Sequence, residues 1–338
     1  MADITVIVPI YNVEKYVEKC LKSLINQSYT NFEVWAVNDG SPDNSKQIVK
    51  KYEKIDSRIK LISQKNGGYG SVLENCIKNI NTKYFIICDP DDWLEENALE
   101  VLYKTAEKEN LDLVVGDKYE VYSDNDEINY KSSLEDSIHL KPNTVYTSIR
   151  DIQLFSFLLV SPHAKLYKTA ISKKIKFPRH VSYTDYILYL LSLAEAKRVE
   201  YINKPLAFYL IDRPGNTTTD SNPKIILYLI KVWNSAYKQL SNYNNVDILW
   251  WRMYAELELI LSKYASISMN KKEMNFYMNE IEAMVYRLMK YRKNIKKVAP
   301  NNIKFRLFFY GVTNKFTCKI FIHLYIKLKQ KNFHRRNV

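Results

Sequence analysis

The segment YFIICDPDDW at residues 84–93 joins an apolar run to a cluster of carboxylates. Its first half, Tyr84–Cys88, is typical of a strand that is buried on both faces of a sheet. The second half places Asp89, Asp91 and Asp92 at the end of that strand, where like charges repel unless a cation lies among them. Oxygen ligands of this kind suit Mg²⁺ or Mn²⁺. The pattern therefore indicates either a divalent-cation site or a solvated acidic turn.

Strands and helices alternate on both sides of this segment. We expect strands at Thr5–Pro9, Phe32–Val37, Lys60–Ser63, Tyr84–Cys88 and Leu113–Gly116. Helices are expected between them, at Glu14–Gln27, Pro42–Tyr52, Ser71–Ile80 and about 95–108. This order predicts an α/β fold with a parallel, doubly wound sheet. Because such sheets bind ligands at the carboxyl ends of their strands, the loops that follow the strands should carry the chemistry.

Two of those loops contain residues suited to a nucleotide. Asp39 follows the second strand and can accept hydrogen bonds from a base or a ribose. The alternative is a plain helix start, with Ser41 or Asp43 as its cap. The segment KNGGYGS at 65–71 holds three of the seven glycines of the chain. Gly67 and Gly68 would let the backbone approach a ligand closely, and the helix that follows presents its N-terminus to a phosphate.

The second half of the chain is less regular. Leu166–Pro178 and Asp185–Ala196 have helical patterns, and strands are expected at Val199–Ile202 and Leu206–Leu210. From Ile225 onward the pattern is helical throughout. We therefore expect an α/β region at residues 1–222 and a helical region at residues 223–338.

Composition excludes several classes of protein. The 338 residues are 46% hydrophobic and 26% charged, and the 7 Gly and 10 Pro exclude collagen-like and low-complexity chains. Neither an apolar run of about 18 residues nor a secretory signal is visible, so we expect a cytoplasmic protein. Cys20, Cys76, Cys88 and Cys318 show no paired spacing and are expected to be free thiols.

Charge is distributed unevenly along the chain. Residues 1–222 carry 28 basic and 31 acidic side chains, whereas residues 223–338 carry 22 basic and 6 acidic ones. After Glu282 there are 15 Lys and Arg and no carboxylate. The basic end indicates either a solvated tail or a surface for polyanions, which would be nucleic acid or anionic lipid.

In order and spacing, five segments resemble inverting family 2 glycosyltransferases, which have the GT-A nucleotide-diphospho-sugar transferase fold with its mostly parallel sheet. The segments are ITVIVPIYNVEKY at 4–16, NQSYTNFEV at 26–34, VNDGSPDNS at 37–45, QKNGGYGS at 64–71 and YFIICDPDDW at 84–93. The form NGGYGS, with His163-Ala164 and Tyr183-Thr184-Asp185 further on, is similar to a bacterial subgroup. The resemblance is close over the first half and looser to about residue 222.

The resemblance implies that residues 1–100 form a nucleotide-binding half and residues 101–222 an acceptor half of one catalytic domain. The donor would be a UDP-hexose or UDP-N-acetylhexosamine. The residues that would surround the donor are Pro9, Tyr11, Glu14, Asp39, Lys65, Gly67, Gly68 and Asp89. Among them, Tyr11 would lie near the base, Asp39 would accept from it, and Asp89 would face the ribose or the metal. Asp91 would bind Mn²⁺ or Mg²⁺.

On the acceptor side, the resemblance implies that Asp185 is the catalytic base. It would take the proton from a hydroxyl of a cell-surface glycan precursor, soluble or lipid-linked, and a single displacement would invert the anomeric carbon. Asp92, His163 and Arg213 would contact the acceptor or the diphosphate, although an isolated His is often a structural residue. The chain departs from the subgroup at Thr184, where relatives have Glu, and after Arg213, so no role is carried over to Asn216 or Thr217.

Two other functions compete with this one. A nucleic-acid-binding protein would explain the basic end, but no nucleic-acid-binding module is visible, so no nucleic acid is expected as a partner. A catalytically inactive glycan-binding module of the same fold is opposed by the presence of Asp91 and Asp185. Zinc spacing and nucleophile motifs such as G-x-S-x-G are also missing from the sequence.

The last helical segment has its own pattern. Every fourth residue from 315 to 331 is basic, which places Lys315, Lys319, His323, Lys327 and Lys331 on one stripe of a helix. Apolar residues surround the stripe. Either this helix packs on the catalytic body with its lysines in solvent, or it lies on the inner face of the membrane, with lysines at anionic headgroups.

Overall fold

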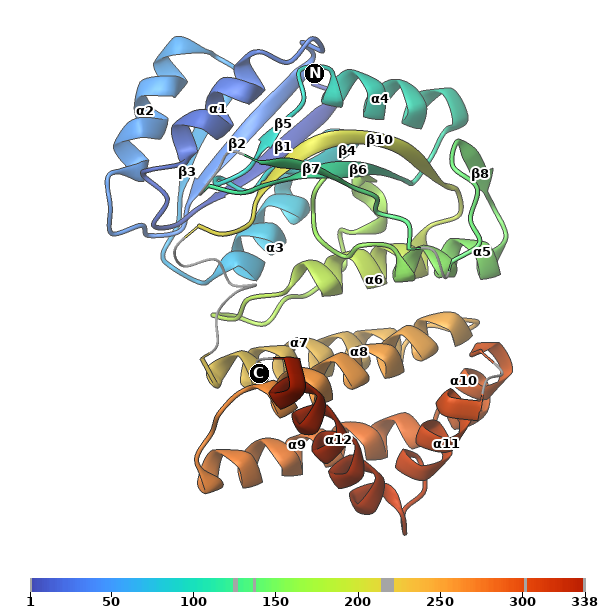
Figure 1. The fold of residues 1–338 in the computed structure, drawn as a ribbon. Coiled ribbons are helices and arrows are strands. Elements are labelled where there is room, and N and C mark those ends of the chain that lie inside the picture. The colour runs from blue at the N-terminus through green and yellow to red at the C-terminus, as the bar shows by residue number, and fades with distance from the viewer. Residues whose placement is uncertain (1, 124–126, 136–137, 214–221, 301–302, 337–338) are drawn as a thin grey trace. The chain divides into compact units, whose positions relative to one another are not determined.

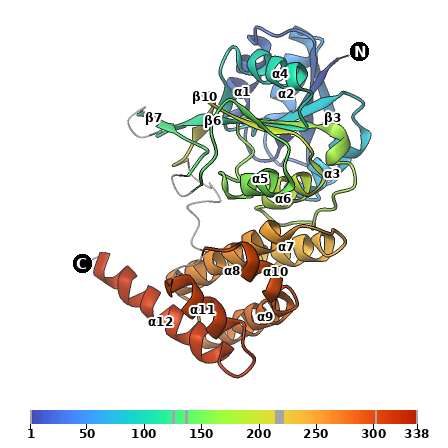
Figure 2. The same ribbon diagram turned by 90° about the vertical axis from the view of Figure 1, so that its right-hand side faces the viewer.

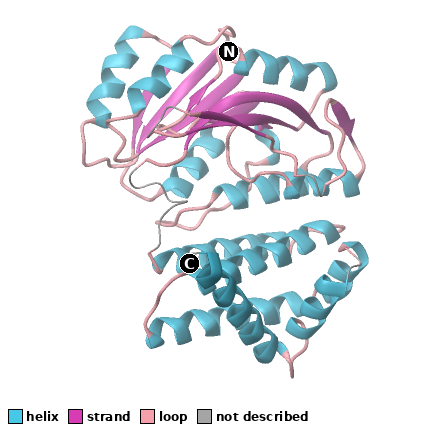
Figure 3. Ribbon diagram, viewed as in Figure 1, coloured by secondary structure: helices cyan, strands magenta, loops and turns pink. Residues whose placement is uncertain are grey.

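A computed structural model describes residues 2–123, 127–135, 138–213, 222–300 and 303–336 (Figure 1). The chain divides into two compact units, residues 1–219 and 220–338. All described strands belong to the N-terminal unit, and the described part of the C-terminal unit is helical (Figure 3). The predicted α/β class and the predicted helical C-terminal region are therefore confirmed.

The described part of the N-terminal unit is built on a sheet of ten strands, eight of which lie in the order β3-β2-β1-β4-β9-β6-β10-β5, while β7 pairs with β6 and β8 with β10. The strands are β1 (Ile4–Ile10), β2 (Phe32–Asn38), β3 (Ile59–Ser63), β4 (Tyr84–Ile87), β5 (Trp93–Leu94), β6 (Leu113–Val121), β7 (Ile128–Lys131), β8 (Thr144–Tyr146), β9 (Lys165–Lys168) and β10 (Val199–Leu210). The strands β1, β2, β3, β4, β6 and β10 share one direction, and the other four run opposite to them.

Helices cover both faces of this sheet (Figure 1). They are α1 (Val17–Ile25), α2 (Ser45–Ile55), α3 (Tyr69–Asn79), α4 (Ala98–Glu109), α5 (Ile149–Leu154) and α6 (Asp185–Glu195). Every residue of β1 is buried, because the strand lies between β2 and β4 and is covered above and below. The four neighbouring strands β3, β2, β1 and β4 are parallel, as predicted, so their carboxyl ends meet at one edge.

The structure corrects two predictions in the second half of this unit. The helix expected at Leu166–Pro178 is wrong: β9 begins there and pairs antiparallel with both β4 and β6, followed by a short 3₁₀ turn at Thr169–Ile171. The two strands expected at Val199–Ile202 and Leu206–Leu210 are one strand, β10, whose register against β6 shifts around Pro205. Non-local pairing decided both outcomes, since nothing in the local pattern encodes it.

The C-terminal unit is a helical bundle (Figure 2). Its helices are α7 (Lys224–Leu240), α8 (Asp247–Ser266), α9 (Lys271–Met289), α10 (Arg292–Val298), α11 (Ile303–Val312) and α12 (Cys318–Arg336). Helix α8 packs against α7, α9, α10 and α12. Buried Trp233 of α7 donates its indole N–H to the carbonyl of Met253 at 2.9 Å, which ties α7 to α8. Among the residues that the structure describes, no helix is both long and apolar enough to cross a membrane.

Candidate active site

The loops after β1, β2, β3 and β4 lie at one edge of the sheet, because these strands are parallel neighbours. The first two loops are joined by reciprocal hydrogen bonds. The backbone N–H of Glu14 donates to Asp43 Oδ2, and the backbone N–H of Asn44 donates to Glu14 Oε2, both at 2.8 Å. Asn44 occupies the N-cap position of α2 without a side-chain cap bond, whereas Asp43 Oδ1 accepts the backbone N–H of Ser45, the first residue of the helix, at 3.1 Å. Tyr11, in the loop after β1, has 51% of its surface exposed, and its ring is suited to stack on a planar ligand.

Asp39 holds the glycine-rich loop in place. Its carboxylate is buried and accepts backbone N–H groups from Gly67 at 2.9 Å and from Gly68 at 2.8 Å. The side-chain amide of Gln64 donates to the same carboxylate at 2.8 Å. Asp39 is therefore an organiser of this loop rather than a helix cap, and its contact with a base stays a prediction.

The glycine-rich loop in turn contacts the segment that leads into α6. Gly67 accepts the backbone N–H of His180 through its carbonyl at 3.0 Å. Gly68 has φ 83° and ψ 167°, a region that essentially only glycine occupies, and a Cβ atom there would lie 2.9 Å from the backbone nitrogen of His180. The two glycines thus bring the loop after β3 against the segment that carries Asp185, the first residue of α6.

An acidic cluster lies where these loops meet. Tyr69 donates its hydroxyl to Asp89 Oδ1 at 2.8 Å. Burial, followed by the negative charge of Asp91 and that of Asp185, raises the pKa of Asp89 to about 7, although the Tyr69 hydrogen bond and Arg213 act the other way. The electrostatic influence of Asp185 on Asp89 indicates that the predicted base lies near the predicted metal-binding loop.

Asp91 is paired with a cation of the protein itself. Arg213 Nε donates to Asp91 Oδ2, and both side chains are mostly shielded from solvent. The guanidinium also lies over the ring of Tyr16, 5.3 Å from its centroid. Asn216 and Thr217, which follow Arg213 in the sequence, lie outside the residues that the structure describes.

Asp92 and His163 form a second, buried pair. His163 Nε2 lies 2.7 Å from Asp92 Oδ2, and the other carboxylate oxygen accepts the backbone N–H of Leu210 at 2.9 Å. Burial, assisted by Lys118 and Lys165, holds the pKa of His163 well below its usual range. A neutral ring that donates its Nε2–H to Asp92 keeps a lone pair on Nδ1, and that buried atom has no hydrogen-bond partner among the described residues.

The side chains present fit a divalent cation. Asp89, Asp92 and His163 offer ligand atoms that lie within 4.8 Å of one another. Oxygen and imidazole donors of this kind suit Mn²⁺, and a cation beside Asp89 would relieve the repulsion that raises its pKa. Asp91, the predicted ligand, adds a further carboxylate in the same loop. The site therefore offers two overlapping ligand sets, one through Asp91 and one through the buried pair.

Two buried lysines behind the site were not predicted from the sequence. Lys165 lies fully buried in β9 and donates its ammonium to the carbonyl of Ser161. Burial lowers its pKa to about 7, and the charge of Asp185 opposes that shift. Lys118 of β6 lies 4.1 Å from the centroid of the Tyr209 ring, and burial lowers its pKa as well. No local pattern marked either one, because β9 reads KLYK and β6 reads LVVGDKYEV, with other charged residues in both strands.

The remaining predicted residues occupy separate places. Pro9 is buried within β1, so its side chain belongs to the core, whereas Lys65 is exposed at the start of the glycine-rich loop. Tyr69, which bonds Asp89, was missed as a functional residue although it stands inside the quoted glycine motif. The structure brings Asp89, Asp91 and Asp185 together, and the donor contacts of Pro9, Tyr11, Glu14 and Lys65 stay predictions.

Comparisons of the sequence with known proteins find glycosyltransferases. The family model described as Glycosyl transferase family 2 matches residues 5–176. The chain is 34% identical over 247 residues to glycosyltransferase GlyA of Streptococcus pneumoniae, a match that covers 71% of this chain and 35% of GlyA. It is 32% identical over 248 residues to the uncharacterized glycosyltransferase MG025 homolog of Mycoplasma pneumoniae, covering 71% of this chain and 77% of that one. The chain thus spans about a third of the length of GlyA.

Solved structures show the same architecture. S. aureus TarS, residues 1–349, in complex with UDP-GlcNAc, superimposes with a TM-score of 0.70 at 18% identity. The match covers 99% of this chain and 92% of the TarS chain. At that identity the likeness is one of fold.

Proposed function

Because the chain belongs to glycosyl transferase family 2 and has its GT-A fold, we propose that it moves a sugar from a UDP-hexose or UDP-N-acetylhexosamine to a hydroxyl group of a glycan. The donor class is supported by TarS, a protein of the same fold that was solved with UDP-GlcNAc. Exposed Tyr11 would stack on the base, and the loop held by Asp39 would lie along the nucleotide.

In this proposal Asp185 is the general base. Asp185 is the first residue of α6. Its carboxylate would take the proton from the attacking hydroxyl group of the acceptor. The acceptor oxygen would bond to the anomeric carbon from the face opposite the diphosphate. One displacement breaks the bond to the diphosphate and inverts the carbon. The observation that carries the proposal is the hydrogen bond from the His180 N–H to the Gly67 carbonyl at 3.0 Å, which supports a base at the start of α6 beside the glycine-rich loop.

A divalent cation, when bound, would neutralise charge on the departing diphosphate. Asp91 would hold it, with Asp89 and the Asp92–His163 pair beside it. Arg213 now neutralises Asp91, so the two cations compete for one carboxylate. An arginine released from Asp91 would be suited to hydrogen-bond the phosphate oxygens.

The acceptor in this proposal is a precursor of a cell-surface glycan, lipid-linked where the enzyme works at the membrane. We place the chain on the cytoplasmic side, at the inner face of the cell membrane, with its basic C-terminal unit as the attachment. The basic excess after Glu282 supports this, because anionic lipids attract such segments.

Donor hydrolysis tests the proposal most directly. UDP-, GDP-, CDP- and TDP-sugars are incubated with the full chain and Mn²⁺, and release of the nucleotide is measured. We expect release from UDP-sugars, loss of it with EDTA and recovery with Mn²⁺ or Mg²⁺. Release from another nucleotide class only would overturn the UDP assignment, and activity that is indifferent to EDTA would overturn the metal assignment.

A further inference from the structure

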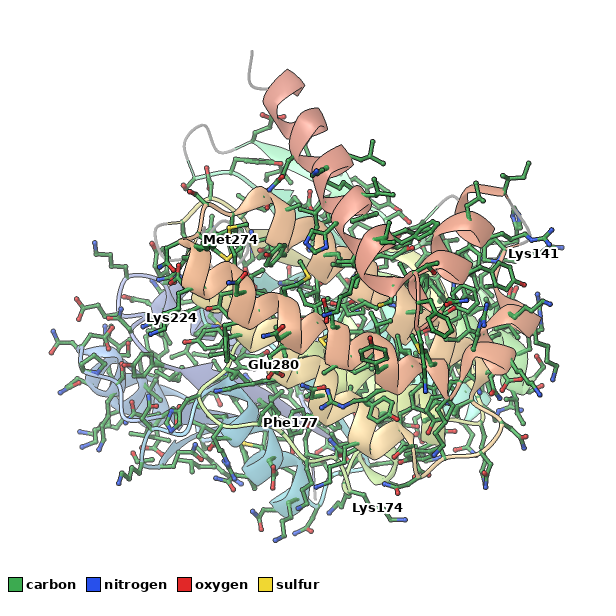
Figure 4. All side chains as sticks on the ribbon, turned by 90° about the horizontal axis from the view of Figure 1, so that it is seen from below. Lys141, Lys174, Phe177, Lys224, Met274 and Glu280 are labelled. Atoms are coloured by element: carbon green, nitrogen blue, oxygen red, sulfur yellow. The ribbon has the colours of Figure 1, made fainter. Side chains whose placement is uncertain are left out.

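As far as its described side chains show, helix α12 packs on the C-terminal unit through one face. Cys318, Ile322 and Ile326 are buried, at positions four residues apart, and they face the bundle where α12 contacts α8 and α11. This stripe satisfies the need of a surface helix for one apolar face. The last turns of the helix extend past the rest of the unit (Figures 2 and 4).

A second apolar row runs along the exposed side. Phe316, in the turn before the helix, is followed by Ile320, Leu324 and Leu328, again four residues apart, and between 50% and 92% of each residue is exposed. The buried stripe already holds the helix on the bundle, so this second row has no packing role within the described part of the unit. An exposed row of large apolar side chains marks a binding surface.

A basic row lies directly beside the apolar one. Lys315, Lys319, His323 and Lys327 each precede a member of the apolar row by one residue, and all four are exposed. Lys319 Nζ lies 3.2 Å from Glu282, which is the last carboxylate in the sequence. No carboxylate follows Glu282 in the sequence, so Lys315 and Lys327 give the basic row a positive charge that no later acidic residue offsets.

Helix α11 extends the apolar surface. An open groove of about 500 Å³ lies between α11 and α12, lined by Ile303, Arg306, Leu307, Tyr310, Gly311, Thr317 and Phe321. Ile303 and Leu307 are 77% and 63% exposed. The groove thus adds apolar side chains, with one arginine among them, on the side of the apolar row that faces α11.

We propose that the two rows of α12, together with the groove, form a docking surface for an anionic lipid bilayer. The surface pairs apolar side chains with cations, which is the chemistry of a headgroup region above acyl chains. A second copy of the same face would bring two basic surfaces together, so a symmetric dimer is disfavoured. The proposal sharpens the proposed membrane location and depends on no part of the proposed transfer chemistry.

In the docked state the apolar row would enter the boundary between headgroups and acyl chains, while the lysines reach back to the phosphates. Each lysine near an anionic surface strengthens binding by about fivefold, and burial of a Leu or Ile side chain adds about tenfold or more. The two contributions are separable, since salt screens only the first.

Sedimentation with sucrose-loaded vesicles tests the surface, using the full chain. We expect binding to vesicles of phosphatidylcholine mixed with phosphatidylglycerol, and little to phosphatidylcholine alone. The triple variant Ile320→Ser, Leu324→Ser, Leu328→Ser should bind about a thousandfold more weakly, and added salt should weaken what remains. The double variant Lys315→Gln, Lys327→Gln should lose about thirtyfold at low salt. Neither change touches the donor-binding loops, so donor hydrolysis without vesicles should stay as in the wild type.

A matched control replaces Ile55, Ile128 and Ile149 by Ser, since these residues of the N-terminal unit are 54–59% exposed. It should bind vesicles like the wild type. Wild-type protein that does not bind anionic vesicles, or a triple α12 variant that binds as well as the wild type, would overturn the proposal. Self-association that the triple α12 variant abolishes would show that a second copy, not lipid, covers the surface. An enzymatically inactive chain that still binds vesicles would count against the transfer reaction only.

Discussion

Asp92 and Lys165 of the N-terminal unit are buried, whereas the basic row of the C-terminal unit lies on the surface. A buried charge is costly unless fixed partners surround it, and Asp92 has two, His163 and the Leu210 amide. Such partners fix the position of each group, and catalysis depends on precisely positioned groups. Surface charges act together and tolerate loose geometry, which suits attraction to a charged plane. The comparison predicts that single substitutions are severe in one unit and gradual in the other.

The severest loss is expected for Asp91→Ala. The variant keeps the backbone at the end of β4 but lacks the carboxylate that would hold the cation, so metal-dependent turnover should fall to the level seen with EDTA. Circular dichroism checks the fold and a Mn²⁺ titration checks the activity. Glu96→Ala, which removes an exposed carboxylate of the next loop, is the matched control and should keep full activity. A well-folded Asp91→Ala protein with normal activity would show that Asp91 is not the metal ligand and would leave only the set of Asp89, Asp92 and His163.

Next in size is Asp185→Asn. The amide preserves the shape of the side chain but cannot accept the proton, so turnover should fall by about 10²-fold or more. The affinity for the UDP-sugar, measured by calorimetry, should change little. If donor binding is lost instead, Asp185 is part of the nucleotide pocket and not the base.

A smaller effect is expected for Gly68→Ala, which tests the link between the glycine-rich loop and the segment before α6. The φ of 83° and ψ of 167° at Gly68 are strained for any residue with a side chain, and the new Cβ would meet the His180 nitrogen at 2.9 Å. The free energy of unfolding should drop by about 1–3 kcal/mol, and turnover should drop with it because Asp185 moves. In the control Gly116→Ala, the nearest atoms are 3.2 Å away and no positive φ is required. Equal activity in the two variants would show that the contact of Gly68 with His180 does not position Asp185.

Local pattern was sufficient for the parallel half of the sheet and for the loops at its edge. There β1, β2 and β3 are each followed by a helix, β4 is an apolar run that ends at the carboxylates, and the loops with the candidate site residues follow these strands directly in sequence. Local pattern failed at Leu166–Pro178, because Leu166 and Tyr167 are buried by pairing with β4 and β6, which lie 50 to 80 residues earlier in the chain.

In the candidate site, too, local sequence predicted some features, whereas contacts between distant residues decided others. The sequence placed Asp89 and Asp91 at a strand end, but it could not show that Asp92 turns inward to the Leu210 amide, 118 residues away. Nor could it place Arg213 on Asp91 or Lys165 behind Asp185. These contacts join distant strands, and only the sheet order brings them together. The periodicity of α12 was visible in the sequence, yet which of its apolar residues are buried depends on α8 and α11.

The smallest effect, and the one that sharpens the comparison most, is expected for Gly311→Ala in the C-terminal unit. A Cβ at Gly311 would lie 2.2 Å from the ring of Phe321, so α11 and α12 would have to separate. Alanine gains about 1 kcal/mol in helix propensity, whereas overpacking costs about 1–3 kcal/mol; a net loss near 1 kcal/mol follows. Hydrogen exchange of the α11 amides should show this loss of stability as faster local opening, while donor hydrolysis stays unchanged.

The double variant Gly311→Ala, Phe321→Leu removes the ring and should restore the slower exchange. Faster exchange that Phe321→Leu does not relieve would show that the ring contact is not the cause, and a parallel loss of hydrolysis would show that the two units are coupled.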